Sequence, residues 1–208
     1  TSKPTALFSN TQIENPNLML EGMPNYRSGV DGLRVSNSTK GGITFAASTT
    51  QNGIHMITVV LGVEAVDGDP YARFVATSSL MNYVVRTFVS SIVVKEGDPY
   101  GKSKATVIDG KSETVLAVAK KDFYIVEKQG SQAEPKIQFK SNQESFRAPV
   151  KSGTNLGKLH YTDPDKIGRG YLEDQEPTVD MVAGRTIEKS FFLKVWWNEF
   201  VRYVNEKL

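Results

Sequence analysis

The chain has 208 residues, of which 39% are hydrophobic and 23% are charged, and its formal net charge is +2 at pH 7. This composition is typical of a globular protein and allows a hydrophobic core of useful size, so disorder is not the default expectation. The small net charge lacks the basic excess of nucleic-acid-binding proteins, so we expect no nucleic-acid partner. The absence of cysteine excludes disulfides, thiolate metal sites and a cysteine nucleophile.

Residues 1–28 are rich in Asn, Pro, Ser and Gly and predict a loop, with the short apolar stretch 18–20 as its anchor. The first ten residues include neither a start methionine nor a signal peptide, so we expect this sequence to be part of a longer protein. The chain has no run of 18 apolar residues of the kind that spans a bilayer as a helix.

A β-hairpin is predicted next, with its arms at 43–50 and 54–61. Asn52-Gly53 lies between the arms and suits the positive φ angles of a type I′ turn. The second arm is almost entirely apolar, which is typical of a strand buried on both faces. Asp69-Pro70 then predicts the start of a helix that extends to about Ser90, with Asp69 as its N-cap.

From Ser91 the pattern changes to short β-type runs separated by turn signals such as Asp109-Gly110. We expect strands at 92–94, 105–108, 114–118, 123–126, 137–139, 156–161 and 178–182. Closely spaced short strands of this kind predict a small all-β sandwich or barrel, with a domain boundary near Ser91.

The final segment, 186–208, contains neither Gly nor Pro and predicts an amphipathic helix. One half of its helical wheel carries apolar and aromatic side chains, and the other half carries polar side chains with balanced charge. Because aromatic residues favour the headgroup level of a membrane, we interpret the helix as an in-plane anchor. The membrane-contacting residues are then Phe192, Trp196, Trp197, Phe200 and Tyr203. The alternative is that this half of the helix packs against protein.

The segment from Gly29 to Phe45 resembles one found in D-alanyl-D-alanine carboxypeptidases, the low-molecular-mass penicillin-binding proteins. In that family Val-Asp-Gly-Leu precedes Lys-Thr-Gly, and here Val30-Asp31-Gly32-Leu33 precedes Arg34-Val35-Ser36. The Asn-Gly turn, the strand Ile-Thr-Val-Val-Leu-Gly, the helix start Ala-Arg-Phe, the β-rich region and the aromatic helix follow in the family's order. The resemblance covers nearly the whole chain, as the C-terminal half of such an enzyme, and is closest to streptococcal members.

This resemblance implies an α+β fold. Residues 1–91 would be the C-terminal part of a penicillin-binding (β-lactamase/transpeptidase-like) α/β domain, residues 92–184 a small all-β domain, and residues 185–208 an amphipathic membrane-associating helix. It also implies a serine-type enzyme of peptidoglycan maturation, exported to the extracellular face of the cytoplasmic membrane. Its partners would be peptidoglycan stem peptides and β-lactams, and it would need no cofactor or metal.

The sequence departs from the family where Arg34-Val35-Ser36 replaces Lys-Thr-Gly. Arg34 keeps the positive charge with a different shape, whereas Val35 lacks the hydroxyl and Ser36 adds a side chain. The backbone N–H of Asn37 falls near the family's oxyanion-hole position, which does not depend on side-chain identity. Arg34 and Asn37 are therefore the candidate substrate-binding residues.

No catalytic residue is expected within this chain. No lysine follows a serine by three positions, as the nucleophile motif Ser-x-x-Lys requires, and Ser-x-Asn is absent. The two histidines, His55 and His160, fall in different predicted domains, which excludes a His-rich metal site. His55 lies in an apolar strand and predicts a packed structural histidine. The alternative function is a non-catalytic pseudoenzyme or a cell-surface binding or interaction module.

Overall fold

The computed structural model describes residues 3–9, 11–38, 40, 42–64, 68–132, 134–163, 165–171, 173, 175–191, 195–197, 200–201 and 203–204. The chain folds into two compact units. Unit 1 comprises Thr1–Ser90 and Val126–Gly130, and unit 2 comprises Ser91–Ile125 and Ser131–Leu208.

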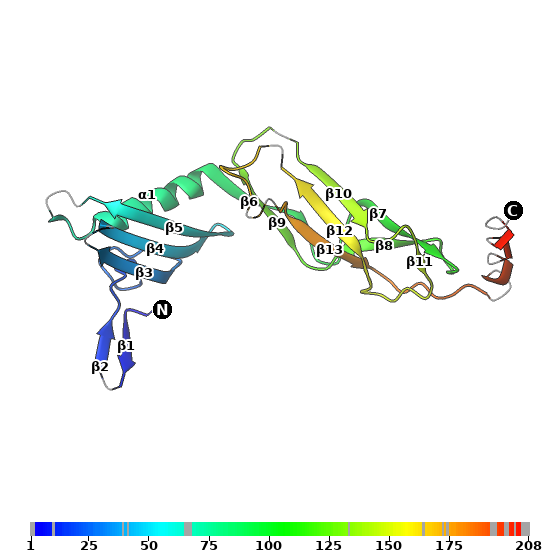
Figure 1. Ribbon diagram of the computed structural model, residues 1–208, viewed down its shortest axis with the longest axis horizontal. Coiled ribbons are helices and arrows are strands. Elements are labelled where there is room, and N and C mark those ends of the chain that lie inside the picture. Colours follow the sequence, from blue (N-terminus) through cyan, green and yellow to red (C-terminus); the bar gives the residue numbers. More distant parts are fainter. Residues whose placement is uncertain are drawn as a thin grey trace. The chain divides into compact units, whose positions relative to one another are not determined.

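Unit 1 contains an antiparallel sheet with the strand order β3-β4-β5. Its elements are β3 (Val30–Ser38), β4 (Gly42–Gln51), β5 (Ile54–Val63) and the helix α1 (Ala72–Thr87). The φ angles of Asn52 and Gly53 are 51° and 74°, which confirms the predicted type I′ turn between β4 and β5. Helix α1 lies along one face of this sheet (Figure 1).

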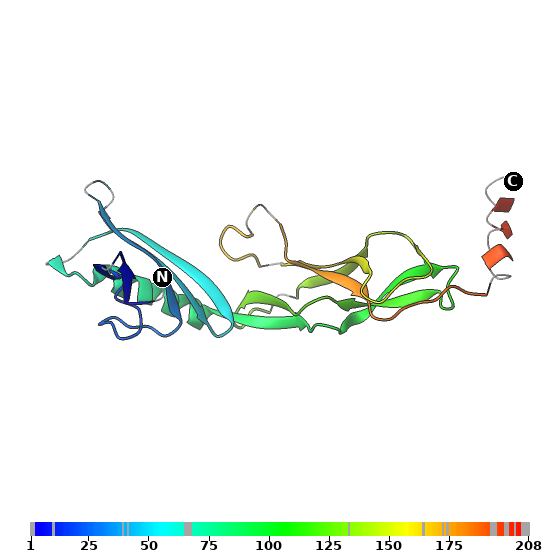
Figure 2. The same ribbon diagram turned by 90° about the horizontal axis from the view of Figure 1, so that it is seen from below.

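The core of unit 1 lies between the sheet and α1. Phe45 of β4 and Phe74 of α1 meet edge to face, with ring centroids 5.1 Å apart, and Met81 is fully buried. Met19 and Leu20 are also buried in this core, so the apolar stretch 18–20 does anchor the N-terminal segment. The sheet and α1 that enclose this core are seen from a second side in Figure 2.

Burial alternates along β5, so the prediction that this strand is buried on both faces is wrong. Every second residue from Ile54 to Val60 faces the core. The residues between them, Ile57, Val59 and Leu61, are 61%, 55% and 74% exposed. Successive side chains of a strand point to opposite faces, and α1 covers only one of these faces. We call the opposite one the outer face of the unit 1 sheet.

The N-terminal segment contains a hairpin that the sequence did not predict. β1 (Thr5–Phe8) and β2 (Thr11–Glu14) pair antiparallel, with Thr5 opposite Glu14. Their four-residue arms are too short to show a hydrophobic alternation, so the polar composition predicted a loop instead.

Helix α1 begins and ends inside its predicted range. Asp69 Oδ1 accepts a hydrogen bond of 2.8 Å from the backbone N–H of Tyr71, and the helix starts at Ala72. It ends at Thr87 because Phe88 is extended and begins β6 (Phe88–Val94), which pairs with β9 (Phe123–Lys128). The boundary between the two units falls within these two strands, so unit 1 also includes Val126–Gly130. The predicted ranges 1–91 and 92–184 assigned these residues to the second domain.

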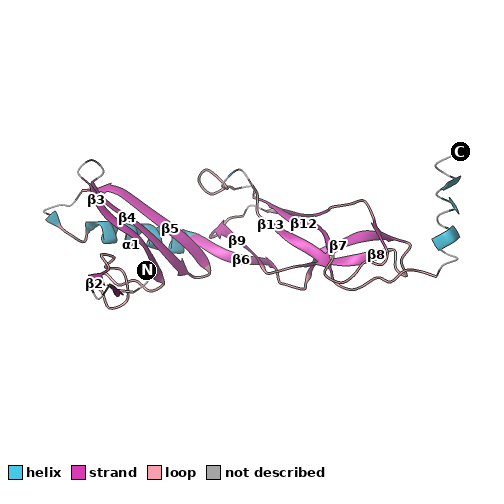
Figure 3. Cartoon of the chain, turned by 60° about the horizontal axis from the view of Figure 1, so that its bottom comes forward, coloured by secondary structure: helices cyan, strands magenta, loops and turns pink. Residues whose placement is uncertain are grey.

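Unit 2 is built on a sheet with the strand order β10-β12-β13-β8-β7-β11. Its strands are β7 (Pro99–Ile108), β8 (Thr114–Ala119), β10 (Lys136–Ser141), β11 (Phe146–Arg147), β12 (Asn155–Thr162) and β13 (Thr178–Ala183). Each predicted β-run from 92 onward is a strand, and Figure 3 shows the strands in magenta. The core includes Val115, Leu156, Leu159, Val179 and Met181, which are at most 1% exposed.

The residues just before the terminal helix differ from the sequence prediction. Ile187 exchanges two backbone hydrogen bonds with Val150, of 2.8 and 2.9 Å, and its side chain is only 4% exposed. The backbone N–H of Ser190 donates to the carbonyl of Asp109. These residues extend the all-β unit, and the helical residues that the structure describes are 195–197, 200–201 and 203–204. A helical wheel cannot detect such pairing, because the partners come from distant parts of the chain.

This pairing affects the stability of an isolated unit 2 fragment. Burial of one large aliphatic side chain contributes about 1.5–3 kcal/mol. We therefore expect a fragment of residues 92–191 to unfold cooperatively and to be about 2 kcal/mol more stable than a fragment of residues 92–184, which lacks Ile187. Urea unfolding of both fragments measures this difference, and equal midpoints would contradict it.

Candidate functional site

The candidate substrate-binding residues lie on β3, an edge strand of the unit 1 sheet. Arg34 pairs with Ala46, and its side chain is exposed on the outer face. Ser36 is two residues further along and lies on the same face. Val35 instead packs against the core of unit 1. The structure therefore places the three residues that replace Lys-Thr-Gly alternately on the two faces of one edge strand.

The end of β3 is held by an arginine from α1, Arg73, which is only 6% exposed. Its Nη1 donates to the backbone carbonyls of Ser36 and Thr44, each at 3.1 Å, and its Nη2 donates to Oδ1 of Asn37. One guanidinium thus joins the end of β3 to the start of β4 from the helix side. Burial lowers the pKa of Arg73 below its ordinary value, although an arginine remains charged at neutral pH.

Arg34 and Asn37 therefore differ in what their side chains do. The Asn37 side chain is used within the fold, where it accepts the hydrogen bond from Arg73. The Arg34 side chain is exposed. Of the two predicted residues, Arg34 thus has an exposed side-chain cation, whereas the side-chain oxygen of Asn37 is bound by Arg73.

Sequence reasoning missed Arg73, although a signal for it exists. Arg73, Thr77 and Met81 are spaced by four residues, and all three are buried on the face of α1 that meets the sheet. An arginine at this spacing within the apolar stripe of a helix indicates a buried cation with backbone partners, because an unpaired buried charge costs several kcal/mol.

His55 is not the packed histidine that its apolar strand predicted. Its side chain is exposed, and Nε2 lies 3.1 Å from Oγ of Ser48 on the neighbouring strand. Among the residues that the structure describes, no group of three or more His, Asp or Glu side chains is placed to hold a metal ion.

The helical residues described near the C-terminus include aromatic side chains that are exposed to solvent. Trp196, Trp197, Phe200 and Tyr203 are 61%, 58%, 49% and 60% exposed. Phe200 stacks against Trp196 and lies tilted against Trp197, with both centroid distances at 6.0 Å. The predicted contact residue Phe192 lies outside the described residues. No helix in the described part of the chain is long and apolar enough to cross a bilayer.

Residues 88–189 match the family described as "Penicillin-binding protein 5, C-terminal domain". This part of the chain is therefore similar to that family. The match begins at β6 and ends at Lys189, so it includes Ile187 and the backbone pairing that extends the all-β unit. The resemblance to low-mass penicillin-binding proteins is thereby confirmed for the region that follows α1.

Two curated relatives extend the similarity toward the N-terminus. The D-alanyl-D-alanine carboxypeptidase DacA of Haemophilus influenzae is 27% identical over 133 residues, which are 64% of this chain and 32% of the relative. DacA of Escherichia coli K12 is 24% identical over 166 residues, which are 80% of this chain and 38% of the relative. The chain thus spans well under half of either relative.

Two crystal structures show a similar fold over 90% of this chain. The peptidoglycan synthesis regulatory factor (PBP3) of Streptococcus pneumoniae is 44% identical and has a TM-score of 0.84, covering 90% of this chain and 51% of its own. Penicillin binding protein 5 of Haemophilus influenzae is 22% identical, has a TM-score of 0.59 and covers 90% of this chain and 50% of its own, a likeness of fold. The identity of 44% to the streptococcal protein agrees with the resemblance to streptococcal members found in the sequence.

Proposed function

We propose that the chain is the C-terminal half of a serine-type D-alanyl-D-alanine carboxypeptidase. The enzyme would act on peptidoglycan stem peptides at the extracellular face of the cytoplasmic membrane, and β-lactams would acylate its serine. The observation that carries this proposal is the outer face of the unit 1 sheet, which combines the cation of Arg34 with an exposed apolar surface.

The apolar side chains Ile57, Val59 and Leu61 are more than half exposed on one strand. Contiguous apolar surface of this kind is unusual on a soluble domain and marks an interaction site. A second layer of polypeptide over this face would bury these side chains and would complete a site beside Arg34. The streptococcal structure has about twice the aligned length, which leaves another half to form such a layer.

In this assembly the unit 1 residues would position the substrate, and the other half would supply the nucleophile. Arg34 would attract the terminal carboxylate of the stem peptide. The backbone N–H of Asn37 would donate to the developing oxyanion. Arg73 touches no substrate and would act as a positioning residue, because it fixes the backbone on either side of Asn37.

A non-catalytic binding protein is the second candidate, and one observation favours it. Val35 stands at the position of the family's threonine, has no hydroxyl and packs against the core of unit 1. A hydrogen bond that the threonine would donate to the substrate carboxylate is therefore missing. Under this alternative the two halves would associate without forming an acyl-enzyme.

Reconstitution with the missing half tests the proposal. The chain would be co-expressed with the remaining half of the streptococcal relative and treated with a fluorescent penicillin before denaturing electrophoresis. This chain alone is expected to take no covalent label, because it has no Ser-x-x-Lys pair. The two halves together are expected to co-purify, and the label is expected on the other half.

A substitution on the outer face of the unit 1 sheet tests whether this surface contacts the other half. Val59→Lys should abolish co-purification, because it places a charge within the apolar face. Val75→Lys on α1, at a residue that is equally exposed at 55%, is the matched control and should leave co-purification unchanged. Co-purification without label would establish the non-catalytic alternative, and a failure to associate would contradict both candidates.

A further inference from the structure

One face of the unit 2 sheet is rich in lysine. Along β10, β12 and β13, side chains that face the core alternate with side chains that point to solvent. We call the solvent-facing surface of this sheet the cationic face. Its basic residues on β7, β10, β12 and the end of β8 are Lys104, Lys120, Lys136, Lys140 and Lys158.

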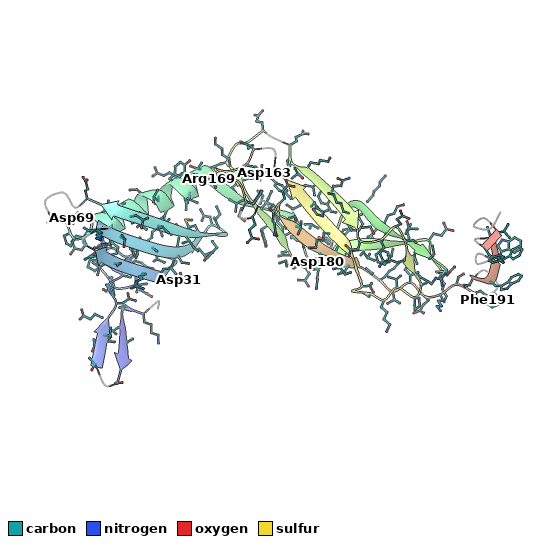
Figure 4. All side chains as sticks on the ribbon, in the orientation of Figure 1. Asp31, Asp69, Asp163, Arg169, Asp180 and Phe191 are labelled. Atoms are coloured by element: carbon teal, nitrogen blue, oxygen red, sulfur yellow. The ribbon has the colours of Figure 1, made fainter. Side chains whose placement is uncertain are left out.

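The densest part of the cationic face is a row across four neighbouring strands. Lys140 pairs with Lys158, and Lys158 pairs with Asp180. The carbonyl of Asp180, a residue labelled in Figure 4, accepts a hydrogen bond of 3.0 Å from the backbone N–H of Lys120. The Nζ atom of Lys120 also lies 4.0 Å from Oδ2 of Asp180. The row therefore contains three lysines and one aspartate, which leaves an excess of positive charge.

Two hollows open on this face, each with a volume of about 400 Å³. The first is lined by Lys120, Lys121, Lys158, Thr178 and Asp180. The second is lined by Lys104, Thr114, Leu116, Val118, Gly184 and Arg185. Strand β8 connects them, and the four steps along the chain from Leu116 to Lys120 span about 13 Å at the usual rise of a strand. Each hollow thus has its own cations. The distance between the two hollows is one that a few repeating units of a linear polymer could span.

We propose that the cationic face binds a linear polyanion, with negative groups of one chain in both hollows. The positive charge of the face favours an anionic ligand. Because the two hollows are separate, a linear ligand that reaches from one to the other can bind in both. Lysine suits such a ligand because its ammonium is a mobile point charge without a fixed bidentate geometry.

His160 of β12 reports the electrostatic potential of this face. Burial lowers its pKa, Lys140 and Lys158 lower the pKa further, and Glu176 opposes them. The imidazole is therefore neutral at neutral pH. A bound anion favours the protonated imidazole, so the pKa of His160 should rise when the polymer binds. His55, the other histidine of the chain, lies in unit 1 and serves as an internal control.

The test uses linear inorganic polyphosphate as the probe, with the whole chain in solution. Binding is measured by calorimetry, and the two histidine signals are followed by NMR as the pH is varied. We expect the pKa of His160 to rise on binding, and we expect the NMR signals of His55 at a fixed pH to stay in place. Raising the salt concentration should weaken binding, because exposed charges are screened.

Charge variants locate the binding surface. The double variant Lys140→Gln and Lys158→Gln should reduce the affinity about tenfold, since each exposed ion pair contributes up to about 1 kcal/mol. Asp180→Asn should raise the affinity, because it removes the opposing carboxylate. The control, Lys111→Gln with Lys151→Gln, removes the same charge at exposed loop residues and should change the affinity less than twofold.

Three outcomes would overturn the proposal. Equal losses in the two double variants would mean that only net charge matters. Monophosphate binding as tightly as polyphosphate would exclude a linear ligand. Binding to anionic phosphatidylglycerol vesicles, measured on a Trp196→Ala and Trp197→Ala background, without binding to polyphosphate would mean that the face contacts lipid instead.

Discussion

Replacing Trp196 and Trp197 together by alanine is expected to reduce the binding of the chain to phospholipid vesicles roughly a hundredfold. The two indoles are about 60% exposed, so most of their surface is available to enter the headgroup region. Removing this apolar area costs about 3 kcal/mol at the usual value per unit area, which corresponds to about two orders of magnitude in affinity. Flotation with liposomes of defined composition measures the effect.

The controls for this experiment distinguish the loss of these two tryptophans from the loss of any exposed aromatic side chain. Tyr124→Ala removes an aromatic residue of unit 2 that is 56% exposed and should leave vesicle binding unchanged. Arg202→Ala should matter much less than the double change, and binding should depend only weakly on salt, because the sequence balances Lys194 and Arg202 against Glu199 and Glu206. A wild-type chain that stays soluble with every lipid mixture would show that the aromatic face packs against protein.

Replacing Arg73 by methionine is expected to destabilise unit 1 by about 3 kcal/mol. The substitution removes the guanidinium donor from the carbonyls of Ser36 and Thr44 and from the amide oxygen of Asn37, and hydrogen bonds to charged groups contribute about 1.5–3 kcal/mol each. The Ser36 carbonyl keeps the hydrogen bond from the Thr44 hydroxyl, which limits the loss there. Part of this loss is offset because the buried guanidinium no longer has to be desolvated. Amide hydrogen exchange at the end of β3 and the start of β4 measures the change locally.

Two further variants identify the cause of such a loss. Arg73→Lys keeps the charge but lacks the planar fork that reaches both carbonyls and Asn37, so it should recover only part of the stability. Arg86→Met, in the exposed last turn of α1, is the matched control and should cost no more than about 1 kcal/mol. Equal exchange rates in Arg73→Met and Arg86→Met would refute the proposed positioning role.

The features that the sequence predicted correctly depend on short stretches of chain. Asn52-Gly53 determines a type I′ turn because both residues tolerate positive φ, whatever surrounds them. The strands from β6 to β13 that were predicted have local runs of β-branched and aromatic residues between turn signals. The ordered series from Val30 to the helix start near Arg73 carried the resemblance to low-mass penicillin-binding proteins, since it preserves both residue types and spacing.

Other features were decided by contacts between residues far apart in the chain. Arg73 meets Ser36 and Asn37 across more than 35 positions, and Ile187 pairs with Val150. The order β10-β12-β13-β8-β7-β11 brings Lys140, Lys158 and Lys120 into one row, although no local pattern joins them.

The apolar sequence of β5 determined that the strand forms but not which of its faces is covered. Only the tertiary structure shows that α1 packs on one face and leaves Ile57, Val59 and Leu61 exposed on the other. A strand's own sequence specifies how its side chains alternate, whereas the layer that covers each face depends on where the rest of the chain packs.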